Sequence, residues 1–232
     1  MKVIGHRGAA GRAPENTVAG VALAFADGAD AVEVDVRLAA DGTPVIIHDE
    51  TLDRTAGIAA RVAALTSAEL AGLIGGDRRI PTLAEVWDAA SGRVVLELKG
   101  AWGSGEAVEA ARVVADFLAS RDVSAAVVSC FDPAALAAFL DAGGTARTGV
   151  ITLEALDPVS NIRAAAEGGH HVCYIPGTLV TAEIVRLAHA AGKEIVAWTV
   201  NDPDVIRALA AAGADGVITD DPGAARAALA AR

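Results

Sequence analysis

Acidic side chains interrupt two of the apolar, strand-like runs in this sequence. Glu33 and Asp35 lie in the run 31–36, and Glu97 lies in the run 94–98. Ionised groups are costly to bury without partners, so these acids either pair with cations or bind something. Residues two apart on a strand project to one face, about 7 Å apart, so Glu33 and Asp35 can converge on one cation with Glu97 as a third ligand. An all-carboxylate set favours hard Mg²⁺ or Ca²⁺.

Two basic residues lie close in sequence to the strand-like runs. Arg7 closely follows the run 3–5, and Lys99 comes two residues after Glu97. Arginine binds anions through its planar fork and lysine as a point charge, so the pair suits a phosphate held on a metal ion. The alternative is structural: each acid forms a salt bridge with Arg7, Arg37 or Lys99, or the cations are plain surface charges. Three acids that converge on one point favour the metal site.

Histidines are the other candidates for chemistry. His6 and His48 each come directly after an apolar run. An imidazole titrates near neutrality, so the two can act as a general acid and a general base, and the sequence leaves open which does which. We interpret His170, His171 and His189 as structural, because they lie at a strand start and on a helix face.

These residues must be positioned by a regular alternation of elements. Short β-rich runs alternate with Ala-rich helical stretches along the chain, which is typical of a parallel sheet. Segments 31–36 and 44–48 are joined by only seven residues, too few for a parallel crossover. They must form an antiparallel hairpin that turns near Asp41-Gly42 and returns His48 to the side of Asp35. Extended segments are predicted at 3–5, 31–36, 44–48, 94–98, 126–130, 147–151, 171–175, 194–200 and 215–219.

Without the returning arm of the hairpin, eight parallel strands remain, which predicts a TIM (β/α)8 barrel. Residues 50–80 are long enough for a small insertion over the same mouth of the barrel, and a doubly wound open sheet is the competing architecture.

No low-complexity linker divides residues 1–232, so we expect one domain. Helices are predicted at 16–27, 82–90, 105–120, 181–191 and 202–212, and after the Asp-Pro caps at 132–133 and 221–222.

Charge and composition exclude several classes of function. The formal net charge is −11 and the 19 basic residues are scattered, so nucleic acid is not an expected partner. The cluster His6-Arg7 leaves no room for a signal peptide, and no apolar run reaches about 18 residues. We therefore expect a cytoplasmic protein without stable membrane association. Cys130 and Cys173 sit inside apolar runs, and we interpret them as small buried thiols.

Taken in order, the motifs resemble those of the glycerophosphodiester phosphodiesterase family. The most specific are His6-Arg7-Gly8, Pro14-Glu15-Asn16-Thr17, Glu33-Val34-Asp35-Val36, Asp41-Gly42 and His48-Asp49. The later ones are Leu52-Asp53-Arg54-Thr55, Pro81-Thr82-Leu83, Glu97-Leu98-Lys99, Phe131-Asp132, Trp198-Thr199-Val200-Asn201 and Gly216-Val217-Ile218-Thr219-Asp220-Asp221-Pro222. The resemblance covers practically the whole chain. At Ser129-Cys130-Phe131 the sequence departs from the two serines more often found there, which affects at most a secondary substrate contact.

The resemblance implies a TIM barrel with a small insertion at 50–80. It also assigns roles to eight residues: the metal ligands Glu33, Asp35 and Glu97, the acid–base pair His6 and His48, the phosphate contacts Arg7 and Lys99, and the pocket wall Trp198. The implied reaction is metal-dependent hydrolysis of substrates such as glycerophosphocholine or glycerophosphoethanolamine to sn-glycerol 3-phosphate and an alcohol.

Several alternatives stay open at the level of the sequence. A phospholipase D-like lyase acting on lysophospholipid or sphingolipid head groups could share these residues, and so could a non-catalytic barrel that binds phosphate esters. The attacking group is either water or the neighbouring hydroxyl of the glycerol acting through a cyclic phosphate. The sequence determines neither the head group, nor the choice between Mg²⁺ and Ca²⁺, nor the oligomeric state.

Overall fold

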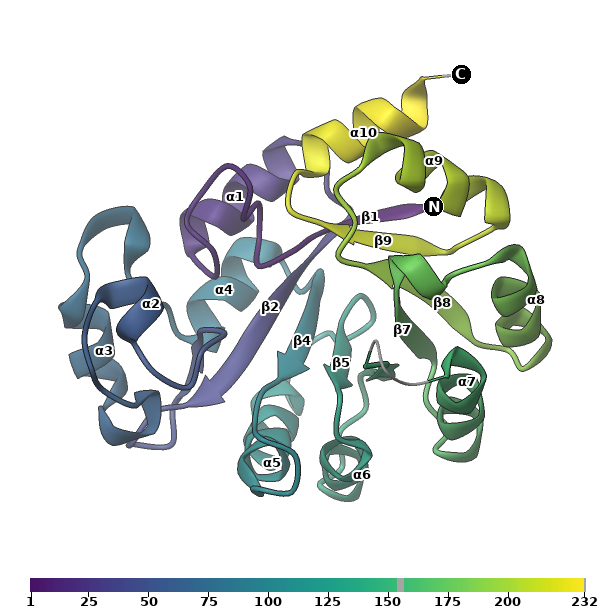
Figure 1. Cartoon of the computed structure of the whole chain (residues 1–232). Coiled ribbons are helices and arrows are strands. Elements are labelled where there is room, and N and C mark those ends of the chain that lie inside the picture. Colours follow the sequence, from purple (N-terminus) through teal and green to yellow (C-terminus); the bar gives the residue numbers. More distant parts are fainter. Residues whose placement is uncertain (154–156, 232) are drawn as a thin grey trace.

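A closed barrel of parallel strands forms the centre of the molecule (Figure 1). The computed structural model describes residues 1–153 and 157–231. Within these ranges, nine strands form one sheet in the order β1-β9-β8-β7-β6-β5-β4-β2-β3, and an additional pairing of β1 with β2 closes eight of them into a ring. The strands are β1 (Lys2–Gly5), β2 (Ala31–Leu38), β3 (Pro44–Ile46), β4 (Val94–Leu98), β5 (Val127–Cys130), β6 (Arg147–Ile151), β7 (Val172–Pro176), β8 (Glu194–Trp198) and β9 (Gly216–Thr219).

This ring is a TIM barrel, so the predicted fold is confirmed and the open doubly wound sheet is wrong. The extra strand β3 lies outside the ring and pairs antiparallel with β2, with Val36 opposite Ile46 and Leu38 opposite Pro44. The hairpin is therefore as predicted, although β3 ends two residues earlier than expected, at Ile46. Beyond it, the Ile47 amide still donates to the Asp35 carbonyl at 2.9 Å, which brings the following residue, His48, to Asp35.

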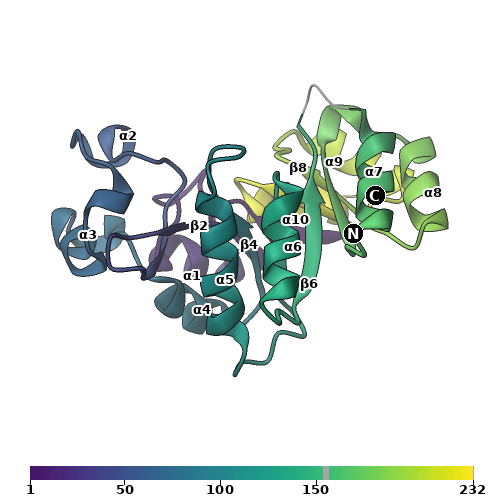
Figure 2. The same cartoon turned by 90° about the horizontal axis from the view of Figure 1, so that it is seen from below.

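Helices surround the barrel on the outside (Figures 1 and 2). In the described ranges the surrounding helices are α1 (Val18–Ala26), α4 (Leu83–Ala90), α5 (Glu106–Leu118), α6 (Pro133–Asp141), α7 (Pro158–Glu167), α8 (Ala182–Ala190), α9 (Pro203–Ala212) and α10 (Pro222–Ala230). Helix α7 is missing from the predicted helices, although Asp157 caps it just before Pro158 in the same way as the predicted Asp-Pro caps.

The alternation of side chains along each barrel strand separates the core from the site. On β2, Val32, Val34 and Val36 face the helices and belong to the main hydrophobic cluster. Glu33 lies on the opposite face and lines a cavity inside the barrel, together with apolar residues of the inner cluster such as Val95 and Ile218. The two-residue period thus buries valines against the helices and directs the acids into the barrel.

Residues 50–80 form a small insertion between β3 and α4. It contains α2 (Asp53–Ala56), α3 (Ser67–Leu73) and the short 3-10 helices η1 (Val62–Ala64) and η2 (Gly76–Arg78). Leu52, Val62 and Leu70 of the insertion pack with Val45 and Ile47 of the hairpin arm in one buried cluster. Figures 1 and 2 show α2 and α3 beside β2, across the molecule from α7 and α8. No helix in the described part of the chain combines the length and apolar character that a membrane span requires.

Candidate active site

A small cavity opens at the carboxyl ends of the barrel strands, the end at which TIM barrels place their active sites. Its volume is about 90 Å³. Of the eight residues singled out in the sequence, seven line this cavity: His6, Arg7, Glu33, His48, Glu97, Lys99 and Trp198. The eighth, Asp35, lies behind them with a side chain that is 2% exposed. The fold thus brings together residues that are up to 192 positions apart in the chain.

Three carboxylates converge at this point. One oxygen each from Glu33, Asp35 and Glu97 lies within 4.8 Å of the others. Glu33 accepts a hydrogen bond from the Arg7 amide at 3.0 Å through Oε2, while its buried Oε1 has no hydrogen-bond partner among the described residues. A buried carboxylate oxygen without a donor is costly, and a cation is the group that would relieve this cost.

The alternative of structural salt bridges holds for two of the three acids. Asp35 lies 3.2 Å from Arg7 Nε and 3.4 Å from Lys99 Nζ, and Lys99 also contacts Glu97 at 2.6 Å. Within the described residues Glu33 forms no ion pair with any cation. Arg37 pairs with Glu106 instead of the three acids, and its Nε donates to the His48 carbonyl. With all three acids ionised, the cluster would carry more negative charge than Arg7 and Lys99 balance.

The pKa shifts of the three carboxylates reflect the same excess of negative charge. Burial, reinforced by the charge of Asp35, raises the pKa of Glu33 to about 8. Burial also raises the pKa of Glu97 despite the nearby Lys99. For Asp35, burial acts upward as well, but the charges of Lys99 and Arg7 outweigh it and lower the pKa. Carboxylates in this arrangement fit a divalent cation, which would hold all three in the charged form.

His6 is held by a carboxylate from the last barrel strand. Its Nδ1 lies 2.6 Å from Oδ1 of Asp220, which follows β9. The Asn201 side chain donates to Asp220 Oδ2 at 2.5 Å and accepts from the Asp220 amide at 2.8 Å, which fixes the carboxylate in turn. Burial acts to lower the pKa of His6, but the hydrogen bond to Asp220 and the charge of Glu33 outweigh it and raise the pKa.

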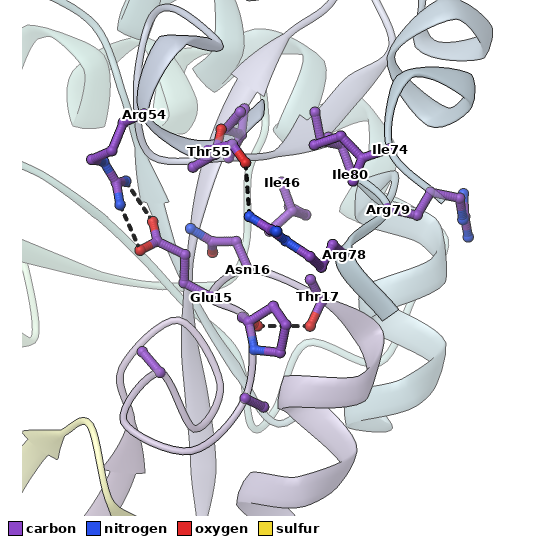
Figure 3. Close-up of a pocket in the computed structure, with 14 residues that line it drawn as sticks. Glu15, Asn16, Thr17, Ile46, Arg54, Thr55, Ile74, Arg78, Arg79 and Ile80 are labelled. Atoms are coloured by element: carbon purple, nitrogen blue, oxygen red, sulfur yellow. Dashed lines mark hydrogen bonds and ion pairs between the residues drawn. The ribbon is translucent and has the colours of Figure 1, made fainter. Parts of the chain in front are cut away.

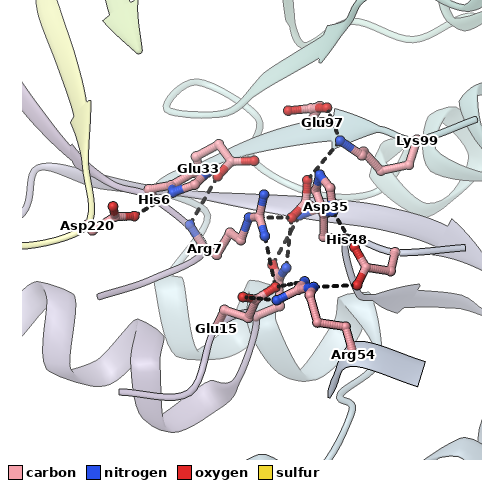
Figure 4. A network of polar contacts seen from close by, with 12 residues as sticks. His6, Arg7, Glu15, Glu33, Asp35, His48, Arg54, Glu97, Lys99 and Asp220 are labelled. Atoms are coloured by element: carbon pink, nitrogen blue, oxygen red, sulfur yellow. Dashed lines mark hydrogen bonds and ion pairs between the residues drawn. The ribbon is translucent and has the colours of Figure 1, made fainter. Parts of the chain in front are cut away.

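His48 is held by a carboxylate next to it in sequence. Its Nδ1 lies 2.7 Å from Oδ1 of Asp49. Arg54 of the insertion donates to both Asp49 and Glu15, and Glu15 also accepts from Arg7 (Figure 4). Burial lowers the pKa of His48, against the opposing charge of Asp35. The two histidines thus share one design, with Nδ1 held by a carboxylate and Nε2 left for other partners.

The loop after β1 adopts a strained backbone that serves the site. Arg7 and Asn16 are non-glycine residues with φ of +48° and +57°. Asparagine tolerates this left-handed region better than most residues, and here its buried side chain both donates to Asp35 Oδ2 at 2.7 Å and accepts from the Asp35 amide at 3.2 Å. Strain of this kind persists where the surrounding structure fixes it, and it is often found at functional sites. It also explains why α1 begins at Val18 instead of the predicted residue 16.

An aromatic wall closes the other side of the cavity. Trp198, at the end of β8, packs edge to face on Phe131 with ring centroids 5.7 Å apart. The indole Nε1 is buried without a hydrogen-bond partner in the described part of the chain. Ser129, in the segment that departs from the family pattern, lines the same cavity, while Cys130 Sγ points to the Leu98 carbonyl at 3.2 Å.

The remaining histidines and the cysteines lie outside this cavity. His170 contacts Thr148 Oγ1 at 3.0 Å, and His189 on α8 contacts Asp215 at 2.9 Å. Both cysteines, Cys130 and Cys173, are free and buried. The interpretation of these residues as structural stays a prediction.

A larger cavity, of about 510 Å³, lies between the loop after β1, the hairpin arm and the insertion (Figure 3). Glu15, Asn16 and Arg54 form its wall on the side of the active site, and Ile46, Ile74 and Ile80 provide apolar surface. Its lining residues include none of the converging carboxylates. We therefore place the chemistry in the smaller cavity, where the acids, histidines and cations meet.

Sequence reasoning assigned no role to five residues that hold the site together. They are Glu15, Asn16, Asp49, Arg54 and Asp220. All five occur in the motifs that carry the family resemblance, so the sequence marked their positions but did not indicate what they do. One signal was available for Asp49, because an acid directly after a histidine can hold its ring.

The fold and the contents of its mouth define a class of protein: a (β/α)8-barrel enzyme with two carboxylate-held histidines, two cations and a carboxylate cluster at the carboxyl ends of its strands. Comparison with known proteins identifies the family. The family model described as "Glycerophosphoryl diester phosphodiesterase family" matches residues 6–224. The chain therefore belongs to this family, and it is a phosphoric diester hydrolase.

Relatives match over nearly the full length of both chains. The chain is 31% identical to a glycerophosphodiester phosphodiesterase of Bacillus altitudinis, over 95% of each protein. It is 30% identical to one of Caldanaerobacter subterraneus, over 95% of this chain and 94% of the relative. A phosphodiesterase of Oleispira antarctica, solved in complex with the product sn-glycerol-3-phosphate, is similar in structure, with a TM-score of 0.88 at 28% identity over 99% of this chain and 96% of that one.

Proposed function

We propose that this enzyme hydrolyses water-soluble glycerophosphodiesters, such as glycerophosphocholine and glycerophosphoethanolamine, to sn-glycerol 3-phosphate and an alcohol with the help of a divalent metal ion. The observation that carries the proposal is the convergence of Glu33, Asp35 and Glu97 within 4.8 Å of one another in the cavity of two carboxylate-held histidines. The similarity to a relative solved with sn-glycerol-3-phosphate supports the choice of substrate.

The carboxylate cluster is the proposed metal site. Glu33, Asp35 and Glu97 would hold the ion, and an all-oxygen set suits Mg²⁺ or Ca²⁺. A bound divalent cation would supply positive charge to a phosphodiester, whose own charge otherwise repels a nucleophile.

Arg7 and Lys99 are the proposed phosphate contacts. Both line the cavity, and both touch Asp35, so each can reach a group that binds beside the acids. Their charges oppose the negative charge that grows on the phosphoryl oxygens in the transition state. Because both are pinned by carboxylates before substrate arrives, little reorganisation is needed during the reaction.

His6 and His48 are the proposed acid–base pair. Each has Nδ1 fixed by a carboxylate, at 2.6 Å for His6 and 2.7 Å for His48, which leaves Nε2 to exchange a proton with substrate. One histidine takes the proton of the attacking group, and the other protonates the departing alcohol, with each step contributing roughly 10²- to 10⁴-fold. Trp198 is the proposed wall against which the glycerol moiety or the alcohol packs.

The test is release of glycerol 3-phosphate from glycerophosphocholine and glycerophosphoethanolamine. The protein is stripped with a chelator and then supplied with Mg²⁺ or Ca²⁺. We expect release only after metal is restored, and a loss of at least about 100-fold in kcat for His6→Ala and His48→Ala. His189→Ala is the matched control, because His189 also pairs with a carboxylate but lies on α8.

Rapid-quench samples from the same reaction distinguish the two attacking groups. A transient cyclic glycerol phosphate identifies the glycerol hydroxyl, and its absence identifies water. If folded, metal-loaded protein releases nothing from these substrates but turns over lysophospholipids, the proposal is wrong and the lipid-directed lyase is correct.

The cytoplasm is the proposed site of action. The two cysteines are free, which suits a reducing compartment. Cell fractionation with detection of the chain tests this, and recovery outside the cytosolic fraction would contradict it.

A further inference from the structure

One guanidinium from the insertion connects two separate parts of the active site. Arg54 lies on α2, a helix of only four residues. Its Nη1 and Nη2 donate to the two carboxylate oxygens of Glu15 at 2.9 and 2.7 Å, and its Nε donates to Asp49 Oδ2 at 2.6 Å. The planar fork of arginine matches this arrangement, and the compact ammonium of lysine does not.

Each of the two carboxylates in turn holds a residue of the proposed catalytic machinery. Asp49 contacts His48 Nδ1 at 2.7 Å through its other oxygen. Glu15 accepts from Arg7 Nη1 at 2.9 Å. Figure 4 shows the resulting chain, which runs from the acid–base histidine through Arg54 to the phosphate-binding arginine.

Three segments of the chain meet at this guanidinium. Glu15 comes from the loop after β1, Asp49 from the residues after β3, and Arg54 from the insertion. Arg54 is half exposed, at 51% of its side chain, so its ion pairs add little to stability on their own. A bidentate ion pair that contributes little to the stability of the fold can still fix the orientation of the side chains that it contacts. Orientation matters because a misplacement of about 1 Å at a reacting group can cost roughly 100-fold in rate.

We propose that Arg54 is a positioning residue, which fixes His48 and Arg7 relative to each other, and that the insertion carries it for this purpose. This inference rests on the proposed function. It assigns Arg54 no contact with substrate, since the residue acts through Asp49 and Glu15. It also gives the insertion a specific task in catalysis beyond covering the hairpin.

Arg79 offers a matched control within the same insertion. It also forms a bidentate pair with a glutamate, Glu85, and it lines the same 510 Å³ cavity as Arg54. The other partner of Glu85 is Thr82, the N-cap of α4, which takes no part in the active site. Loss of Arg79 therefore removes a similar fork without disturbing His48 or Arg7.

The experiment compares Arg54→Ala, Arg54→Lys and Arg79→Ala as metal-loaded proteins with glycerophosphocholine. We expect Arg54→Ala to lose roughly 10- to 100-fold in kcat, with a smaller change in KM, and Arg79→Ala to keep the wild-type kcat. Arg54→Lys should recover only part of the loss, because a point charge cannot serve both carboxylates. Methylguanidinium should restore part of the activity of Arg54→Ala alone, since the cavity gives it access to the vacated position.

A spectroscopic measurement separates this inference from the proposed function. Nitrogen NMR of the histidine rings reports the tautomer of His48, which we expect to carry its proton on Nδ1 in the wild type and to lose this preference in Arg54→Ala. An unchanged His48 signal in that variant, or a kcat equal to that of Arg79→Ala, overturns the positioning role. If the wild type turns nothing over, the proposed function fails, and the histidine signals alone decide the role of Arg54.

Discussion

Glu33 is a single residue whose burial inside the barrel would be explained by a ligand. It is 3% exposed, and one of its oxygens has no donor among the described residues. Asp35 and Glu97 have basic partners that offset their burial, whereas Glu33 has the backbone amide of Arg7 alone. Such a residue is unfavourable for folding by itself, and a bound cation is the condition under which it becomes favourable.

We predict that Glu33→Gln changes stability in opposite directions with and without metal. In chelator-treated protein near neutral pH the variant should melt at a higher temperature than the wild type. Burial and the charge of Asp35 raise the pKa of Glu33 to about 8, so Glu33 must take up a proton on folding, and glutamine need not. In the presence of Mg²⁺ or Ca²⁺ the wild type should be stabilised and the variant should not, with metal affinity at least about tenfold weaker. Thermal melts across a metal titration measure both effects. A variant that metal stabilises as much as the wild type would remove Glu33 from the proposed site.

The pairing of secondary-structure elements determines which distant residues come into contact. His6 follows β1 and Asp220 follows β9, and these two strands pair in register from Lys2 opposite Gly216 to Gly5 opposite Thr219. The register places the residues that follow each strand side by side, so the histidine meets its carboxylate although 214 positions separate them. Closure of the barrel thus assembles a histidine–carboxylate pair that neither strand contains alone.

We predict that Asp220→Asn lowers both the pKa of His6 and kcat. The hydrogen bond to Asp220 contributes to a pKa of His6 above its ordinary value of 6.5. A group whose pKa is raised on folding adds stability that is complete below the unfolded pKa and is lost as pH rises through the folded pKa. The free energy of unfolding of the wild type should therefore fall, relative to Asp220→Asn, as the pH rises above the ordinary pKa of 6.5 and through the raised pKa of folded His6. Denaturant titrations at several pH values, with an NMR titration of His6, measure this.

Asp202 provides the control for this prediction. It is also an aspartate near the mouth, but it caps α9 by accepting from the amides of Asp204 and Val205. Asp202→Ala should cost about 1 kcal/mol of stability at every pH and leave kcat unchanged. A His6 pKa that is the same in Asp220→Asn as in the wild type would show that Asp220 does not set the state of the histidine.

At the scale of the whole molecule, we propose that barrel and insertion form one domain. Leu52, Val62 and Leu70 of the insertion share a buried cluster with Val45 and Ile47 of the hairpin arm. Strand β3 pairs with barrel strand β2, which attaches this cluster to the barrel. A unit whose core includes a strand hydrogen-bonded to the barrel should unfold with the barrel.

We therefore predict a single thermal transition, which Leu70→Ala lowers as a whole. Leu70 is fully buried on α3, so the substitution should cost about 2 to 5 kcal/mol. Calorimetry of the metal-loaded protein, with intrinsic fluorescence as a second probe, measures the transition. A separate early transition in the variant would mean that the insertion folds independently. Leu187→Ala, an exposed leucine on α8, is the control and should change little.

The strands, the barrel and the eight candidate residues could be predicted from the sequence, because each leaves a local mark in it. Acids within valine-rich strands break the apolar pattern, and the short link between 31–36 and 44–48 allows only a hairpin. Helix α7 was missed although its Asp-Pro cap was visible. The folded chain was needed to see that Asp35 and Glu97 have basic partners while Glu33 has none among the described residues, and to see which residues hold His6, His48 and Arg7. Asp49 and Glu15 lie near His48 and Arg7 in the sequence, but Asp220 follows another strand and Arg54 comes from the insertion. No local pattern records their contacts, which span 214 positions for His6–Asp220 and 39 for Arg54–Glu15.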